Sequence, residues 1–336
     1  MKSIILSKTG GPDVLQLSEI DIPNVKDHQV LIKNKYAGIN YADLLTRQGL
    51  YSWAPKRPSI PGLEVTGIVE KVGKEVTNFK VGDKVVAGMR NGGYAEYSAV
   101  DEKTVLPADN GFSWEELGSM TVTWMTAWIA LHQMARVREN EILLVQAAAG
   151  GVGSSAVQLG VAHGMKVYGT SSPHKFETIK KLGGTPLNYH DFDEILRRNN
   201  ELPDCVLESI GGDVYNRSFK ILAPMGRLIT IGGTGIQVNK YNPVSLLKAW
   251  KAIPKIHFNR LIRFSKGVMG FHIGYLLEIS EKLIDEWYKL LAVMNSHNLR
   301  PVIHKDHIFP LSEAGKAHQF IHDRKNVGKV LLDVSK

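Results

Sequence analysis

The pattern of apolar and polar positions changes near residue 123. Before that point, short apolar-rich runs are separated by glycine and proline, as in Val30–Lys33, Val65–Val69 and Lys84–Ala87. Short strands with regular turn signals between them are typical of an all-β unit that closes into a barrel. We therefore expect the residues before position 123 to form mainly β-structure.

After residue 123, helical periodicity alternates with continuous apolar runs. Helical spacing in Trp124–Met134 and Ser154–His163 flanks the run Ile142–Ala147. Such runs are typical of parallel strands that are buried on both faces, and the alternation predicts a doubly wound α/β sheet. Further buried strands are expected at Lys166–Thr170, Cys205–Glu208, Arg227–Ile231 and Val268–Ile273. The end of the chain predicts a long helix from Glu278 onward, a short β segment near Val302, a helix after Ser312 and a last strand at Val327–Val334.

Composition limits the class of protein. The chain has 336 residues, of which 43% are apolar and 22% charged, so we expect a folded protein of two domains. No apolar stretch reaches the roughly 18 to 20 residues that span a bilayer. The apolar run at the amino terminus ends at Ser7, which is too early for a signal peptide. Cys205 is the only cysteine, so a cytoplasmic enzyme is expected.

A glycine-rich segment joins the run Ile142–Gln146 to the helix that follows it. Ala148, Gly150 and Gly153 occupy the three marked positions of G-x-G-x-x-G, with alanine in place of the first glycine. Gly150 permits close approach of a phosphate to the backbone, and Gly153 permits close packing of helix on strand. A tight turn with a purely structural role is the alternative. We predict that this loop binds a dinucleotide pyrophosphate, through Ala148, Gly150, Gly151, Val152 and Gly153.

The stretch after the next strand carries no carboxylate. NAD-binding folds usually place Asp or Glu about 20 positions beyond the loop, where it bonds the ribose 2′-hydroxyl. Here the stretch holds Ser171 and Lys175 instead. Hydroxyls and a fixed cation suit a 2′-phosphate, so the sequence favours NADPH over NADH. The alternative is that Lys175 is only a solvated helix residue.

Several separated motifs together resemble one known family. They are Leu144-x3-Ala148-Ala149-Gly150-Gly151-Val152-Gly153-x4-Gln158, Ala37-Gly38-Ile39-Asn40, Arg47-Gln48-Gly49-Leu50-Tyr51, Pro61-Gly62-Leu63-Glu64-x-x-Gly67 and Val81-Gly82-Asp83-Lys84-Val85. This set resembles the quinone oxidoreductase and zeta-crystallin group of the medium-chain dehydrogenase/reductase superfamily. Within the group, Asn40–Leu44, Gly270–Leu276 and Lys325–Val330 are most similar to the vesicle amine transport protein subfamily. The resemblance covers essentially the whole chain.

The resemblance implies an α/β protein of two domains. A GroES-like β-barrel catalytic domain would comprise residues 1–122 and 277–336, and a Rossmann NADPH-binding domain residues 123–276, with the site in the cleft between them. It also implies a homodimer that pairs the strands Val268–Ile273. The substrate would be a small molecule, and no nucleic-acid reader motif is present.

The zinc ligands of the superfamily's alcohol dehydrogenases are missing from this chain. Those enzymes carry cysteine where this chain has Asn40, and Gly-His-Glu where it has Gly62-Leu63-Glu64. Glu64 alone does not hold zinc, and the pair His304 and His307 is more typical of surface decoration, so we expect no metal.

Without a Lewis acid, reduction of a quinone or an α,β-unsaturated carbonyl is favoured over oxidation of an alcohol. Asn40 and Tyr51 match the family's active-site segment and are the candidates to bind the carbonyl oxygen. Asp43 and Arg47 are expected to pair with each other. Many quinone oxidoreductases have tyrosine where this chain has Leu45, so a more apolar pocket is expected.

The resemblance also implies which residues line the cofactor. A structural role for each strand end or loop glycine remains the alternative. Besides the glycine loop, the implied residues are Thr126, Ser171, Lys175, Tyr189, Gly211, Gly232, Gly233, Phe271 and Asn326.

The net charge of +8 is concentrated in one segment, residues 244–266, which mixes aromatic and cationic side chains. Three explanations remain open: a solvated helix face, a patch for an acidic ligand, and a peripheral membrane contact. Pro254 interrupts any single helix there. A second function therefore stands beside the enzyme, that of a vesicle-associated adaptor of the same fold with little or no turnover.

Overall fold

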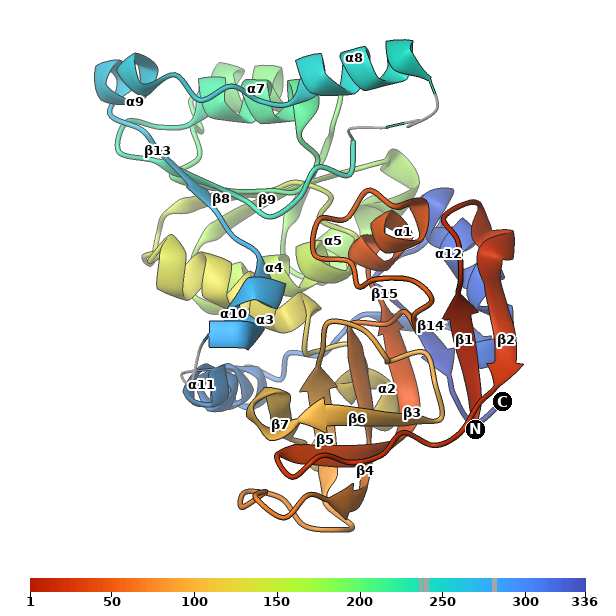
Figure 1. Ribbon diagram of the computed structural model, residues 1–336. Coiled ribbons are helices and arrows are strands. Elements are labelled where there is room, and N and C mark those ends of the chain that lie inside the picture. Colours follow the sequence, from red (N-terminus) through yellow and green to blue (C-terminus); the bar gives the residue numbers. More distant parts are fainter. Residues whose placement is uncertain (236–237, 239–241, 280–282) are drawn as a thin grey trace. The chain divides into compact units, whose positions relative to one another are not determined.

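The computed structural model describes residues 1–235, 238, 242–279 and 283–336 (Figure 1). The chain divides into two compact units, one of Met1–Met125 with Ile273–Lys336 and one of Thr126–His272. These boundaries lie three and four residues from the expected 122/123 and 276/277. No helix in the described ranges is both long and apolar enough to cross a membrane.

The first unit is built on a sheet that combines strands from both ends of the chain. The strand order is β14-β15-β3-β4-β5-β7, and β6 also pairs with β3. All pairs are antiparallel except β14 with β15. The strands of this unit are β1 (Lys2–Leu6), β2 (Leu15–Glu19), β3 (Gln29–Ile39), β4 (Glu64–Val72), β5 (Lys84–Gly88), β6 (Tyr97–Asp101), β7 (Val105–Pro107), β14 (Ile303–Pro310) and β15 (Lys329–Asp333).

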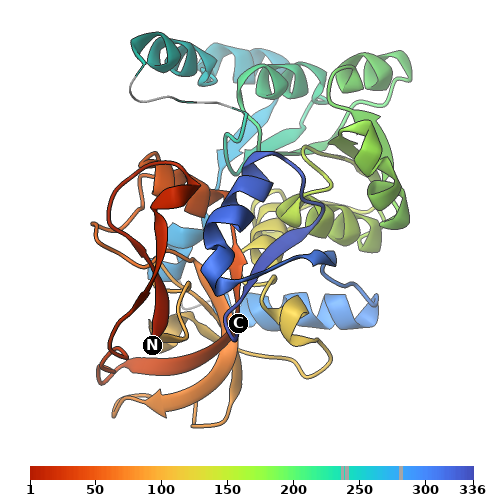
Figure 2. The same ribbon diagram turned by 90° about the vertical axis from the view of Figure 1, so that its right-hand side faces the viewer.

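The long strand β3 organises the first unit. Its amino-terminal half pairs with β6 and its last four residues pair with β15, so the carboxyl end of the chain lies directly beside Ala37–Ile39. Helix α12 packs against η1 and β2 (Figure 2). The helices of the first unit are η1 (Pro12–Val14), α1 (Tyr41–Gln48), η2 (Glu102–Thr104), α2 (Trp114–Leu117), α10 (Ile273–Ile279), α11 (Leu283–Ser296), η5 (Leu311–Glu313) and α12 (Ala314–His322).

The second unit contains a six-stranded parallel sheet in the order β10-β9-β8-β11-β12-β13. The order reverses between β8 and β11, which makes their carboxyl ends the topological switch point where ligands of such sheets bind. The strands are β8 (Ile142–Val145), β9 (Lys166–Ser171), β10 (Thr185–Asn188), β11 (Cys205–Glu208), β12 (Arg227–Thr230) and β13 (Gly267–Gly270).

Helices cover both faces of this parallel sheet, with α4 and α7 on opposite sides (Figure 1). The core between α7, α6 and the sheet includes Leu144, Val206 and Phe219. The helices are α3 (Thr123–Trp128), which crosses the unit boundary, the π-helix η3 (Ile129–Met134), α4 (Gly151–Ala162), η4 (Pro173–Lys175), α5 (Phe176–Lys181), α6 (Phe192–Arg198), α7 (Gly212–Ile221), α8 (Pro243–Ala252) and α9 (Phe258–Phe264).

Most predicted elements are confirmed, with three differences. The helix predicted over Trp124–Met134 is divided into α3 and the π-helix η3. Strand β10 was not predicted from the sequence. The long helix predicted from Glu278 onward corresponds to α11, and its expected start includes residues 280–282, which lie outside the described residues.

Candidate functional site

The turn from β8 to α4 has the geometry of a phosphate-binding loop. Ala147 has a φ of +53°, and the N–H of Gly150 donates to the Ala147 carbonyl at 3.0 Å, so the chain reverses tightly before the helix. A Cβ on Gly153 would lie 2.7 Å from Ala148 Cα and still closer to the Ala147 carbonyl, so no side chain fits there. No side chain caps the start of α4. Its first amides and positive dipole end therefore suit an anion.

The adjacent strand ends bring the predicted 2′-phosphate residues to one edge of the sheet. Strand β10 pairs with β9 so that Asn188 lies opposite Ser171, and Tyr189 follows directly. Lys175 closes the short helix η4 that begins two residues after Ser171. Because no carboxylate stands between Ser171 and Lys175, this edge offers hydroxyls and a cation.

A buried carboxyl shapes the loop after β11. Glu208 Oε1 accepts hydrogen bonds from the N–H groups of Ile210 and Gly211, each at 2.8 Å, and Gly211 has a φ of +76° that favours glycine. Burial raises the pKa of Glu208 to about 7. Beside this loop lies a cavity of about 130 Å³. It is lined by Gly211, Tyr215, Thr230, Gly232, Pro254 and Ile256.

The parallel sheet gathers most of the predicted cofactor residues. The loops and helix starts that follow the six strands lie at the carboxyl edge. Together with Ser171, the last residue of β9, they hold every predicted cofactor residue of the second unit except Thr126, which lies in α3. Phe271 follows β13 and its N–H donates to the Thr230 carbonyl at 3.0 Å. Asn326 belongs to the first unit instead.

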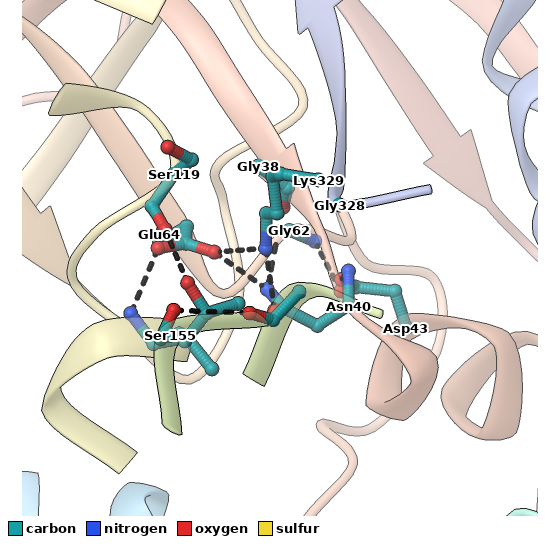
Figure 3. A network of polar contacts seen from close by, with 12 residues as sticks. Gly38, Asn40, Asp43, Gly62, Glu64, Ser119, Ser155, Gly328 and Lys329 are labelled. Carbon is teal, nitrogen blue, oxygen red and sulfur yellow. Dashed lines mark hydrogen bonds and ion pairs between the residues drawn. The ribbon is translucent and has the colours of Figure 1, made fainter. Parts of the chain in front are cut away.

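In the first unit, Asn40 belongs to a buried polar cluster with Glu64 and Lys329 (Figure 3). The Lys329 ammonium donates to Glu64 Oε1 at 2.5 Å and to Asn40 Oδ1 at 2.6 Å. Asn40 Nδ2 donates to the same Glu64 oxygen at 2.9 Å. The other oxygen of Glu64 accepts from the Val122 N–H at 2.8 Å. The absence of a side chain at Gly38 provides the space for the Glu64 carboxylate, because a Cβ there would lie 2.5 Å from Glu64 Oε1.

Asp43, on the first turn of α1, is held by backbone groups. Its carboxylate accepts from the N–H of Asn40 at 2.8 Å and from the N–H of Gly62 at 3.2 Å. Complete burial raises its pKa to about 7. The expected pairing with Arg47 is wrong, because within the described ranges no ion pair joins the two side chains, and Nε and Nη1 of the buried Arg47 have no hydrogen-bond partner there. Burial lowers the pKa of Arg47, which lies two residues before the Gly49 cap of α1.

Tyr51 lies in an aromatic group that follows α1. Its ring meets Trp53 edge-on with centroids 6.5 Å apart, and Trp53 lies 6.1 Å from the ring of Tyr275. The Arg90 guanidinium lies over Trp53 at 5.8 Å. Burial, with the nearby Asp43 charge, raises the pKa of Tyr51, so its phenol stays protonated and can donate a hydrogen bond.

The positions at which the superfamily's alcohol dehydrogenases bind catalytic zinc have different contacts in this chain. Asn40 and Glu64 bind an ammonium group, and Leu63 is buried and apolar. Over the ranges that the structure describes, no group of three or more His, Cys, Asp or Glu side chains is arranged to hold a metal ion.

Sequence reasoning did not identify Lys329, Glu208, Trp53 or Tyr275 as site residues. Lys329 and Tyr275 lie in motifs that carry the family resemblance, which was the available signal for them. The pattern gave no sign that Lys329 binds Glu64, which is 265 positions away in the chain.

Known family models match two parts of the chain. Residues 26–110 match the alcohol dehydrogenase GroES-like domain, and residues 185–332 match a model described as zinc-binding dehydrogenase. Together with the structural similarity below, these matches confirm the predicted combination of a GroES-like domain with a Rossmann-type parallel sheet.

Curated proteins and solved structures match nearly the whole chain. It is 35% identical to the synaptic vesicle membrane protein VAT-1 homolog of Danio rerio, over 98% of this chain and 69% of that protein. It is 32% identical to the quinone oxidoreductase of Sus scrofa, over 99% of this chain and 97% of that protein. The crystal structure of Escherichia coli quinone oxidoreductase complexed with NADPH is similar with a TM-score of 0.88 and 27% identity, over 99% of this chain and 100% of that one.

Proposed function

Because the chain belongs to the medium-chain dehydrogenase/reductase superfamily, alongside quinone oxidoreductases and VAT-1 homologues, we propose that it is a zinc-independent, NADPH-dependent oxidoreductase that reduces a quinone or an α,β-unsaturated carbonyl. The observation that carries the proposal is the uncapped amino terminus of α4 behind the tight Ala147–Gly150 turn.

The second unit fits NADPH at two places. The loop from Ala148 to Gly153 leaves room for a pyrophosphate against backbone amides, because Gly150 and Gly153 carry no side chain. Ser171, Lys175 and Tyr189 would hold the 2′-phosphate at the neighbouring strand ends. The relatives' complexes with NADPH support NADPH as the cofactor.

The first unit supplies hydrogen-bond donors to the acceptor. Bound NADPH supplies the hydride. As the acceptor's carbon is reduced, negative charge develops on its oxygen, where preorganised neutral donors stabilise it. We assign this role to Asn40 and Tyr51. The rings of Trp53 and Tyr275 beside Tyr51 suit a flat conjugated acceptor.

A cofactor titration tests the proposal. We expect NADPH to bind at least ~10-fold more tightly than NADH, about 1.4 kcal/mol, when followed by cofactor fluorescence. Lys175→Ala should reduce this preference, because it removes the cation at the 2′-phosphate. Lys180→Ala is the matched control, since Lys180 lies on the next helix and pairs with Glu177 at the surface. Equal affinities for NADPH and NADH would refute the assignment of the 2′-phosphate site.

A second candidate function is supported by the surface of α8 and α9. A solvated face would turn polar side chains outward, whereas this segment exposes nine large apolar ones beside five of its six Lys and Arg side chains. No Asp or Glu occurs between Asp213 and Glu278, so the surface complements an anionic bilayer. The exposed apolar residues are Val244, Leu246, Leu247, Trp250, Ile253, Ile256, Phe258, Ile262 and Phe264.

This candidate is a peripheral membrane adaptor of the same fold with little or no turnover. Sedimentation with phosphatidylserine-containing vesicles, but not with phosphatidylcholine vesicles, is the expected result, and salt should weaken it. Trp250→Ser with Phe258→Ser should abolish the binding, whereas Val81→Ser, an exposed apolar residue elsewhere, should not. Protein that stays in the supernatant at low salt would refute membrane contact.

A further inference from the structure

The buried ion pair of Lys329 and Glu64 contacts both ends of the Asn40 side chain. The ammonium donates to Asn40 Oδ1 at 2.6 Å, and the carboxylate accepts from Asn40 Nδ2 at 2.9 Å. Lys329 and Glu64 are 3% and 0% exposed, so water does not compete for these bonds. The second N–H of the amide is only weakly held, by the Gly38 carbonyl at 3.4 Å.

An ammonium only donates hydrogen bonds and a carboxylate only accepts them. Their placement therefore permits one orientation of the Asn40 amide and excludes the orientation in which oxygen and nitrogen are exchanged. The pair also polarises the amide, since its oxygen faces a cation and its nitrogen faces an anion. The fixed orientation determines the direction of the weakly held N–H, and the polarisation changes its strength as a hydrogen-bond donor.

We infer that Lys329 and Glu64 are positioning residues, which fix the Asn40 amide so that its second N–H is presented to the oxygen of the acceptor. The inference rests on the proposed function and deepens it. It also gives a role to the buried cation that contacts Asn40 and Glu64, two positions where the zinc enzymes have metal ligands. The cation acts through Asn40, and no contact of its own with the acceptor is required.

A double-mutant cycle tests this positioning. Lys329→Met alone leaves the Glu64 charge buried without its cation and endangers folding, so the neutral pair Lys329→Met with Glu64→Gln is used. We expect the pair to lower kcat of NADPH oxidation by roughly tenfold or more, as loss of a preorganised donor does. The affinity for NADPH should not change. Added to Asn40→Ala, the pair should cause no further loss of kcat.

The matched control is a second, partly buried ion pair, Arg227 with Glu141, at 2.6 Å in the other unit. Arg227→Met with Glu141→Gln should leave kcat unchanged, because Arg227 begins β12 at the sheet edge opposite the predicted cofactor loops. A wild-type kcat in the variant with Lys329→Met and Glu64→Gln would overturn the inference. It would also be overturned if the losses of kcat from this pair and from Asn40→Ala added up in the triple variant.

A second readout does not depend on turnover. The Asn40 side-chain amide can be observed by NMR in protein with ¹⁵N-labelled asparagine and identified by its absence in Asn40→Ala. We expect one N–H to be shifted downfield by the Glu64 carboxylate, and the neutral pair to remove this shift. If the neutral pair left the spectrum unchanged, the positioning role would be refuted even if no acceptor is reduced. The proposed function fails in a different case, in which none of the acceptors tested oxidises NADPH in the presence of the wild type.

Discussion

Gly150 and Gly153 occupy the same loop, but substitution should affect them differently. At Gly153 an added Cβ would lie 2.7 Å from Ala148 Cα, whereas ordinary contact begins at 3.4 Å, so α4 would have to move by at least 3.4 − 2.7 = 0.7 Å. Such overpacking costs about 1–3 kcal/mol, and Gly153→Val should lower the free energy of unfolding by at least this amount. It should also abolish NADPH binding, because the loop and the helix start are displaced.

At Gly150 the nearest atom to an added Cβ is the Ala147 carbonyl oxygen at 3.4 Å, and the φ of −84° suits any residue. Gly150→Ala should therefore cost at most about 1 kcal/mol, the usual loss from alanine at a helix N-cap. Its methyl group would meet the phosphate, so NADPH should bind at least ~10-fold more weakly. Urea unfolding and fluorescence titration measure the two quantities. Wild-type NADPH affinity in Gly150→Ala would show that this loop is not the pyrophosphate site.

Two further predictions concern metal and pH. Zinc or a strong chelator should leave folding and activity unchanged, since the ligand set is missing; one tightly bound zinc per purified chain, measured by metal analysis, would contradict this. His318 is fully buried, its Nε2 lies 3.1 Å from Tyr94 Oη, and burial lowers its pKa to about 3. At pH values between the lowered pKa and the ordinary pKa, His318 is protonated in the unfolded chain and neutral in the folded chain. In this pH range His318 therefore makes the free energy of unfolding rise with pH, by about 1.4 kcal/mol per pH unit. The stability of wild type relative to His318→Gln should grow from about pH 4 to 6.5 and then level off; a constant difference would refute the buried neutral histidine.

The sequence was sufficient for the parts of the fold that depend on local pattern. Strands β8, β9, β11 and β12 were predicted within two residues because each is a continuous apolar run. Strand β10 was not predicted, since Thr185–Asn188 is short, contains proline and has only Leu187 buried. Its place is set by pairing with β9 and not by its own composition.

The candidate site divides in the same way. The glycine loop is visible in the sequence because its strand, turn and helix are consecutive. The Asn40 cluster is not, because Lys329 lies 289 positions from Asn40 and is brought to it only by the pairing of β15 with β3. Neither residue type nor spacing indicates that contact, and the same holds for Trp53 with Tyr275, which come from distant parts of the first unit.

Hydride transfer from NADPH, without zinc, is the central claim, and stopped-flow oxidation of deuterated NADPH by metal-free protein tests it most directly. A panel of quinones and enones should include an acceptor that oxidises NADPH faster than NADH, with deuterium at C4 slowing the reaction and, for an enone, appearing in the product. Asn40→Ala should slow this step, by up to about 2.7–4 kcal/mol in the barrier if the donor is preorganised in a dry site. No oxidation of NADPH by any acceptor of the panel, or activity that appears only after zinc is added, would contradict the account.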